Sequence, residues 1–108
     1  MKIKISKLVR TIITYDIHDD NTRDALVRAL EKIGFQSEID QSTMTNNKLI
    51  TFRTLIVINN LCKDPETNFS KGDLITIYAS HLIVKEEKPE AVIIKKDYFY
   101  SPKENQFV

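Results

Sequence analysis

Hydrophobic residues along this chain follow two kinds of spacing, one typical of strands and one typical of helices. Residues 8–17 are dense in β-branched and aromatic side chains and contain neither proline nor glycine, which predicts a central strand. A helix is expected next, because Leu26 and Leu30 stand at helical spacing after the candidate N-cap residues 19–21. Gly34 follows at the left-handed position where helices commonly end.

The rest of the chain has a less regular pattern. Residues 35–45 are extended in character but mostly polar, which predicts an edge strand or a strand with an irregularity. Residues 49–61 contain many β-formers, yet their apolar positions also cover one helical face, and we predict a helix. Residues 74–84 and 91–100 are rich in β-formers, and a proline-containing turn separates these two predicted strands.

The order of these elements predicts an α+β domain, namely a ferredoxin-like βαββαβ-type sandwich with an extra C-terminal strand. Residues 1–108 are expected to form this single domain, because the length supports one modest core. Residues 1–7 are expected to form a basic N-terminal arm, and residues 101–108 a loose tail. Two helices on one sheet face leave the other face bare, so we expect a homodimer that covers it.

Composition narrows the class of protein. The chain is 42% hydrophobic and 29% charged, with a formal net charge of +1, which indicates neither disorder nor a membrane protein. No segment approaches the roughly twenty apolar residues that a membrane span needs. The N-terminus lacks the apolar core of a signal peptide, and the single Cys62 excludes an intrachain disulfide. We therefore expect a cytoplasmic protein with no membrane partner.

Asp16 is the first candidate for chemistry, because it ends the predicted first strand and precedes the predicted helix. One carboxylate per chain cannot hold magnesium tightly, since that ion requires several oxygen ligands in octahedral geometry. In a dimer whose first strands end at the two-fold axis, two Asp16 side chains could share one ion that activates water. The alternative is that Asp16 caps the helix or pairs with an arginine.

Three further kinds of residue are candidates for a part in chemistry at Asp16. His18 is a candidate general base or ligand, but a histidine beside acids at a helix entry is more often solvated. Asp19 and Asp20 are interpreted mainly as helix caps. Ser42 has no histidine or lysine partner in a recognisable constellation, so we expect it to donate a hydrogen bond to phosphate and not to act as a nucleophile.

Basic residues gather at two places despite the small net charge. The first ten residues contain four cations and no acid, and two adjacent lysines stand close before three aromatic residues. The six candidate nucleic-acid-binding residues are Lys2, Lys4, Lys7, Arg10, Lys95 and Lys96. Such residues can contact the phosphates of DNA or RNA. The alternative is a solvated strand edge whose lysines prevent aggregation. The chain has only two glycines, which excludes a glycine-rich phosphate loop.

Several short motifs in the first 45 residues resemble the CRISPR-associated protein 2 family. They are the strand Ile12-Ile13-Thr14-Tyr15-Asp16-Ile17, a helix with an early Arg23, Gly34-Phe35 after that helix, and the segment Gln41-Ser42-Thr43-Met44. Two departures stand out, because Thr43-Met44 replaces the family's usual Val-Phe and about ten extra residues precede the first motif. The virulence-associated protein D group, which shares this fold and has ribonuclease activity, is the alternative.

The resemblance implies a dimeric subunit of antiviral defence that works in CRISPR spacer acquisition, with DNA or RNA and the CRISPR integrase subunit as partners. It implies that Asp16 is the catalytic, metal-linked residue of a magnesium-dependent endonuclease, and that Ser42 lies near Asp16 and takes part. A toxin-type metal-dependent ribonuclease would use the same Asp16. A third possibility is a ferredoxin-like dimer that only binds a partner, with Asp16 in a structural role.

Overall fold

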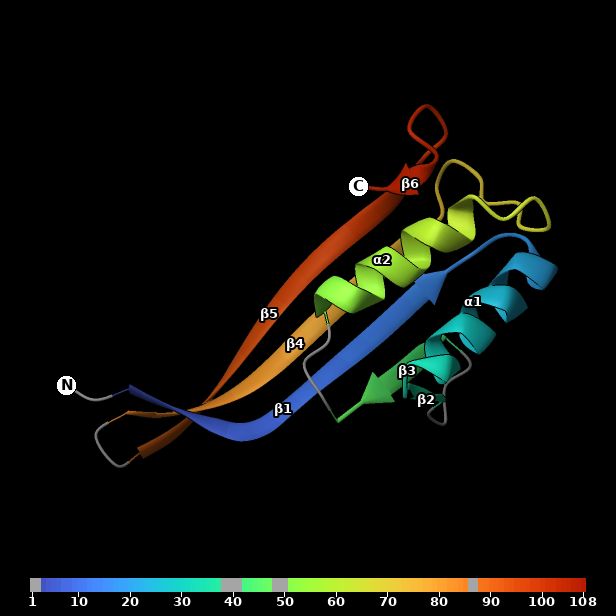
Figure 1. Cartoon of the computed structure of the whole chain (residues 1–108). Coiled ribbons are helices and arrows are strands. Elements are labelled where there is room, and N and C mark those ends of the chain that lie inside the picture. The colour runs from blue at the N-terminus through green and yellow to red at the C-terminus, as the bar shows by residue number, and fades with distance from the viewer. Residues whose placement is uncertain (1–2, 38–41, 48–50, 86–87) are drawn as a thin grey trace.

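A six-stranded antiparallel sheet with two helices makes up the computed structural model, which describes residues 3–37, 42–47, 51–85 and 88–108 (Figure 1). Within it, only the backbone is described for residues 3–9, 81–85 and 88–91. The elements in chain order are β1 (Ile3–Asp16), α1 (Asp20–Lys32), β2 (Gln36–Ser37), β3 (Thr43–Asn46), α2 (Thr51–Cys62), β4 (Leu74–Lys85), β5 (Lys88–Ser101) and β6 (Gln106–Phe107).

The topology is that of the predicted ferredoxin-like α+β fold. The strand order is β2-β3-β1-β4-β5-β6, so β3 lies between the two strands that α1 connects. In the same way, β1 lies between the two strands that α2 connects, and all neighbouring strands are antiparallel. Both helices cover one face of the sheet (Figure 1). The added strands β5 and β6 extend the sheet at the β4 edge.

Helix α1 begins and ends as the sequence predicted. Asp19 is the N-cap, and its carboxylate accepts from the Thr22 backbone N–H at 2.9 Å and from the Thr22 hydroxyl at 2.7 Å. The same hydroxyl accepts from the Asn68 backbone N–H at 2.7 Å, which ties a distant loop to the helix. After the helix, Gly34 has φ +100°, where a side chain would be strained and its Cβ would crowd Asn46.

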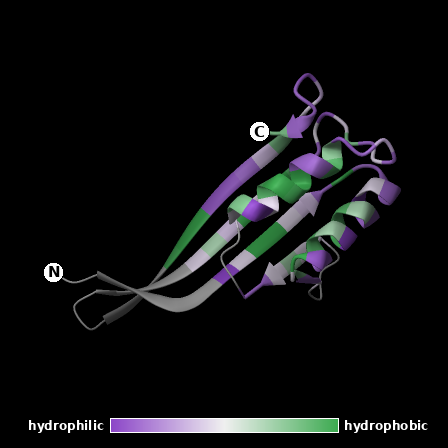
Figure 2. Cartoon of the chain, in the orientation of Figure 1, coloured by the Kyte–Doolittle hydropathy of each residue, from purple (hydrophilic) through white to green (hydrophobic). Residues whose placement is uncertain are grey.

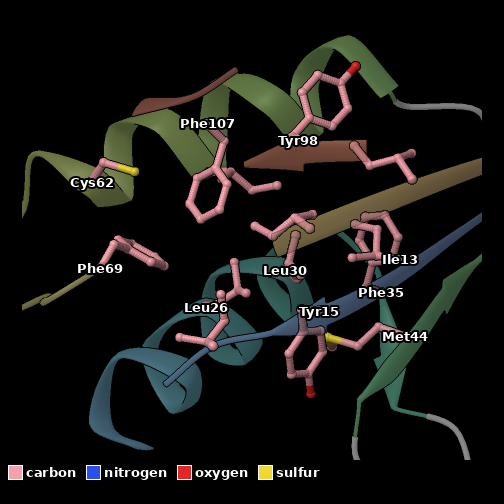
Figure 3. Close-up of a cluster of buried hydrophobic side chains, with 14 residues drawn as sticks. Ile13, Tyr15, Leu26, Leu30, Phe35, Met44, Cys62, Phe69, Tyr98 and Phe107 are labelled. Atoms are coloured by element: carbon pink, nitrogen blue, oxygen red, sulfur yellow. The ribbon is translucent and has the colours of Figure 1, made fainter. Parts of the chain in front are cut away.

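The core lies between the helices and the sheet (Figure 3). Leu26 and Leu30 of α1 and Ile58 of α2 are fully buried against Ile13 of β1 and Ile75 of β4. Residues 49–61 were predicted as a helix, and α2 confirms this, with Thr54, Ile58 and Cys62 forming its buried face at helical spacing. Phe52 and Ile56 of α2 remain exposed.

Two strand predictions differ from the structure. β1 starts at Ile3 and pairs with β4 from there, so residues 3–7 belong to the sheet and not to a separate arm. A register shift between Ile5 and Val9 interrupts that pairing, and Lys2 lies outside the described residues. Residues 35–45 were predicted as an edge strand or a strand with an irregularity. They form two antiparallel strands, β2 and β3, around the undescribed residues 38–41, and β2 is an edge strand of the described sheet.

The prediction of a loose tail after Ser101 is wrong. Residues 106–107 form β6 against β5, and Phe107 is only 3% exposed. Its ring packs edge-on against Phe69 at 5.2 Å between centroids, and its backbone N–H donates to Asn59 Oδ1 at 2.9 Å. These partners lie about forty residues earlier in the chain, so local pattern carried no sign of the contact.

The second face of the sheet has no covering element among the described residues, and we call it the open face. Side chains alternate along each strand, so neighbours of the buried Ile13 and Tyr15 point to this side. Along β5, a hydrophobic stretch is followed by a hydrophilic one (Figure 2). The open face comprises Thr43 and Thr45 of β3, Arg10, Ile12, Thr14 and Asp16 of β1, Leu74, Thr76, Tyr78 and Ser80 of β4, and Ile93, Lys95, Asp97 and Phe99 of β5.

Candidate active site

The candidate site lies where three elements meet at one edge of the sheet. β1 ends at Asp16, α1 starts at Asp20, and β4 starts at Leu74, which pairs with Asp16. The turn between β1 and α1 carries His18, and the residue before β4 is Asp73. The antiparallel pairing of β1 with β4 therefore brings together side chains that are 55 residues apart.

Asp73 is a fully buried carboxylate that holds His18. Its Oδ1 atom accepts the His18 backbone N–H at 3.0 Å and also bonds to the imidazole Nδ1. Its Oδ2 atom accepts the Ser70 backbone N–H at 2.8 Å. The backbone of Asp73 is also fixed, since its carbonyl accepts from the Tyr100 N–H at 3.0 Å. Asp73 thus holds the His18 imidazole, the chain segments at His18 and Ser70, and strand β5.

The His18 side chain is 61% exposed, so the ring is fixed at one nitrogen and open to solvent. With Nδ1 bound to Asp73, Nε2 is the nitrogen available to a ligand. The hydrogen bond to Asp73 and the charge of Asp73 raise the pKa of His18 above its usual value. Desolvation partly opposes this increase, and the charge of Asp16 contributes least to it. A carboxylate that orients an imidazole in this way is a recurring part of acid–base catalysts.

We expect the pKa of His18 to lie above 6.5 when it is measured by NMR titration of the imidazole protons. Because the folded pKa exceeds the unfolded one, this pair stabilises the fold fully below about pH 6.5, and the contribution is lost as pH rises through the folded pKa. His18→Gln identifies the resonance, and Asp73→Asn should lower the midpoint. A midpoint at or below 6.5 in the unaltered protein contradicts the role assigned to Asp73.

Asp16 is exposed and lies on the open face two residues before His18. The possibility that Asp16 caps α1 is wrong, because Asp19 occupies that position. Among the described residues Asp16 forms no ion pair, whereas Asp20 pairs with Arg23 at 2.8 Å. Asp19 caps the helix as predicted, whereas Asp20 is the first helical residue and pairs with Arg23 instead of capping. Asp16 is left as a carboxylate open to solvent.

Ser42 lies beside the end of β1. Its carbonyl accepts the Tyr15 backbone N–H at 3.1 Å, so the segment that precedes β3 runs next to the residue before Asp16. Ser42 is half-buried. The chain segments of the two motifs are thus neighbours, and a catalytic part for Ser42 stays a prediction.

The predicted basic residues do not form one cluster. Arg10 and Lys95 belong to the open face, whereas Lys96 belongs to the helix-covered side of β5. Lys95 Nζ lies 5.9 Å from the centre of the Tyr78 ring, and Lys96 Nζ lies 5.2 Å from that of Tyr98. The structure describes only the backbone of Lys4 and Lys7 within β1, and Lys2 is outside the described residues.

One chain offers few side chains that could bind magnesium. In the described part of the chain, no group of three His, Cys, Asp or Glu side chains is placed to hold a metal ion. Asp73, Asp19 and Asp20 use their carboxylates for His18, Thr22 and Arg23. Asp16 alone does not fit a magnesium site, so the predicted ion depends on oxygen ligands from outside this chain.

A groove of about 670 Å³ between α1 and α2 lies apart from this site. It is lined by Ala25 and Ala29 of α1, by Leu61 of α2 and by charged residues of both signs, such as Arg28 and Asp64. Neither Asp16 nor His18 lines it. The groove therefore plays no part in the chemistry considered for the end of β1.

Sequence reasoning missed Asp73. The only local sign was an acid between Gly72 and an apolar strand, a place where a carboxylate often serves a turn. For His18, the expectation of a solvated side chain was half right, because the ring is exposed but held by Asp73.

Comparisons of the chain with protein families, with curated proteins and with solved structures found no match. The likeness to CRISPR-associated protein 2 thus stays a prediction carried by its motifs. Neither helix in the described part of the chain is long and apolar enough to cross a membrane.

Proposed function

We propose that this protein is a homodimeric, cytoplasmic nucleic-acid-binding protein that cleaves phosphodiester bonds at the end of β1. One observation carries the proposal, which is the exposed His18 imidazole held by buried Asp73, two residues from the exposed Asp16. An imidazole and a carboxylate with different environments form a pair suited to donate and accept protons.

Hydrolysis of a phosphodiester needs a base for the attacking water and an acid for the leaving oxygen. In the proposed step Asp16 accepts a proton from water, the hydroxide bonds to phosphorus, and the bond to the leaving oxygen breaks. His18 donates the Nε2 proton to that oxygen. Asp73 is a positioning residue, because it fixes the ring through Nδ1 and stabilises its protonated form. These proton transfers use only groups of this chain.

The homodimer is supported by the open face. Ile12 and Tyr78 are half-buried neighbours there, and the half-buried Leu74 lies beside the exposed Phe99, with no covering layer in the described structure. A sheet face that exposes apolar side chains in this way commonly binds another protein surface. A second copy is the simplest partner, because most soluble oligomers are symmetric homo-oligomers.

The motifs that resemble CRISPR-associated protein 2 favour a role in DNA capture together with an integrase subunit. The toxin-type ribonuclease is the second candidate, and the observation that favours it is the same acid–base pair, which suits cleavage of RNA as well as DNA. Magnesium remains the predicted cofactor, with Asp16, water and substrate phosphates as its ligands.

Cleavage of end-labelled DNA and RNA, with and without magnesium, tests this function. We expect Asp16→Asn and His18→Gln each to lower the rate on the order of a hundredfold, the usual contribution of a general acid or base. Asp24→Asn, an exposed acid on α1, is the matched control and should cleave normally. Normal cleavage by folded Asp16→Asn and His18→Gln would remove both residues from the mechanism. Binding without any cleavage by the unaltered protein would leave a non-catalytic binding module.

A further inference from the structure

Charges on the open face are separated along the strands. The register places Arg10 in one row with Ser80 and Ile93, and Asp16 in the opposite end row with Leu74 and Phe99. These end rows are six residues, or about 20 Å, apart. Two inner rows lie between them. The row next to Arg10 consists of Thr45, Ile12, Tyr78 and Lys95, and the row next to Asp16 consists of Thr43, Thr14, Thr76 and Asp97. Among the side chains that the structure describes, Arg10 and Lys95 lie in one half of the face, and Asp16 and Asp97 lie in the other half.

We infer that the open face binds the open face of a second copy with the strands antiparallel, so that Arg10 pairs with Asp16 and Lys95 with Asp97 across a two-fold axis. This inference rests on the homodimer proposed above and specifies its geometry. The axis lies in the interface, perpendicular to the strands, and passes between the Ile12 row and the Thr14 row. Such an interface is self-complementary, as two-fold symmetry requires.

This axis reverses the order of the rows on the partner while it keeps each strand opposite its own copy. The cationic half of one face then meets the anionic half of the other, and every charged pair occurs twice. Packed sheets lie about 10 Å apart, a gap that an arginine or lysine opposite an aspartate can span. The four charged side chains described on this face are exposed in the single chain, so a partner can reach each of them. Asp97 also accepts a hydrogen bond from the Thr76 hydroxyl at 2.7 Å.

The apolar residues of the face match under the same axis. Ile93 is 66% exposed and Phe99 is 51% exposed, and they occupy opposite end rows of β5. Reversal of the rows places Ile93 against Phe99 of the partner subunit, so both gain an apolar contact. This contact occurs twice in the dimer, once at each end of β5. Its burial adds a hydrophobic contribution to the stability that the ion pairs give.

The other in-plane two-fold axis, parallel to the strands, fits less well. It keeps the rows in place, so that Arg10 and Lys95 lie over the cationic half of the partner and the two aspartates over the anionic half. Like charges close together in an interface disfavour that arrangement. The charge pattern therefore distinguishes between the two ways of stacking identical faces.

The inferred axis completes the candidate site with a residue from the second copy. Arg10 of the partner subunit lies beside Asp16, where a guanidinium can bind both the carboxylate and a substrate phosphate. The two Asp16 side chains are then about 20 Å apart along the strands, so they do not share one metal ion. Each dimer would hold two separate sites, each with an arginine from the other chain.

A charge-exchange experiment on Lys95 and Asp97 tests the geometry by light scattering and sedimentation at micromolar concentration. Lys95→Asp alone puts two like-charge pairs in the dimer, and so does Asp97→Lys. Each should weaken dimerisation roughly tenfold or more. An equimolar mixture of the two variants restores opposite charges at both positions and should form a heterodimer of twice 12.5 kDa. The double variant should dimerise with itself for the same reason.

Lys96→Asp is the matched control, because Lys96 belongs to the other face of the same strand and its change should leave the dimer intact. Asp97→Lys loses the hydrogen bond from the Thr76 hydroxyl and could fail to fold for that reason. In that case Arg10→Glu tests the pair between Arg10 and Asp16 of the partner subunit, and it should also weaken dimerisation. Arg10 is exposed, so its replacement does not disturb the core.

The outcomes separate this inference from the proposed function. An unaltered protein that stays at 12.5 kDa overturns the homodimer and the inferred interface together. A dimer that persists with normal affinity in Lys95→Asp and in Arg10→Glu overturns the interface and leaves the homodimer standing. Loss of the dimer in the single variants without recovery in the mixture also overturns the opposite-charge pairing.

Discussion

Replacement of Ile13 by glutamate should unfold the protein. Ile13 is fully buried between the sheet and the helices, where it belongs to the same cluster as Leu30 and Met44 (Figure 3). Loss of the buried side chain costs about 2 to 3 kcal/mol, and burial of a carboxylate there costs several kcal/mol more. The total is comparable with the whole free energy of unfolding of a small domain, about 5 to 15 kcal/mol. Urea denaturation followed by circular dichroism measures the change.

Ile12→Glu is the control for this prediction, because Ile12 is the neighbouring strand residue on the open face. Its half-buried side chain borders solvent in the single chain, so the variant should fold but lose the dimer. A comparison of the two variants thus separates the core from the proposed interface. If Ile13→Glu folds with an unchanged urea midpoint, the assignment of Ile13 to the helix-covered face is wrong.

Replacement of Asp73 by alanine should lower the free energy of unfolding by about 3 to 5 kcal/mol. The change leaves the backbone N–H groups of His18 and Ser70 and the His18 imidazole without their acceptor. Hydrogen bonds to a charged group contribute about 1.5 to 3 kcal/mol each, and the three are not fully additive. Because His18 is exposed, water replaces part of its lost bond, which keeps the expected loss below the full sum.

Asp64→Ala is the matched control for Asp73→Ala. Asp64 also accepts a backbone N–H, that of Glu66, but in an exposed turn where water can take its place. We expect its urea midpoint to change by the equivalent of about 1 kcal/mol or less. Equal midpoints for the two variants would show that the burial of Asp73 adds nothing to stability.

The two proposals compete for the same basic residues. If Arg10 and Lys95 pair with acids of a second copy, they are no longer free for phosphate along the whole face. Contacts with nucleic acid then fall to Lys96 on the other side of β5 and to the predicted N-terminal lysines. Arg10 could contact phosphate only at the site itself, where it pairs with Asp16 of the second copy. A salt titration of DNA binding by Lys96→Ala shows this as a reduced slope.

The sequence alone determined most of the elements, because their signals are local. The candidate caps at residues 19–21, Gly34 and the helical spacing of Leu26 and Leu30 predicted α1. The structure shows that Asp19 is the cap and confirms the other two signals. The apolar positions of residues 49–61 predicted α2 in the same way. Helix caps and periodic burial act over a few residues, so a single sequence carries them.

Only the tertiary structure decided which distant residues meet. His18 and Asp73 are 55 residues apart, and Phe107 and Asn59 are 48 apart. The sequence around each residue does not indicate its partner. The first contact follows from the pairing of β4 with β1, and the second from the packing of β6 against α2. The charge pattern of the open face depends in the same way on the register of three strands. Strand pairing sets such contacts, and it depends on residues far apart in the sequence. The sequence therefore indicated Asp16 and His18 as candidate site residues but did not indicate Asp73, which holds His18 in place.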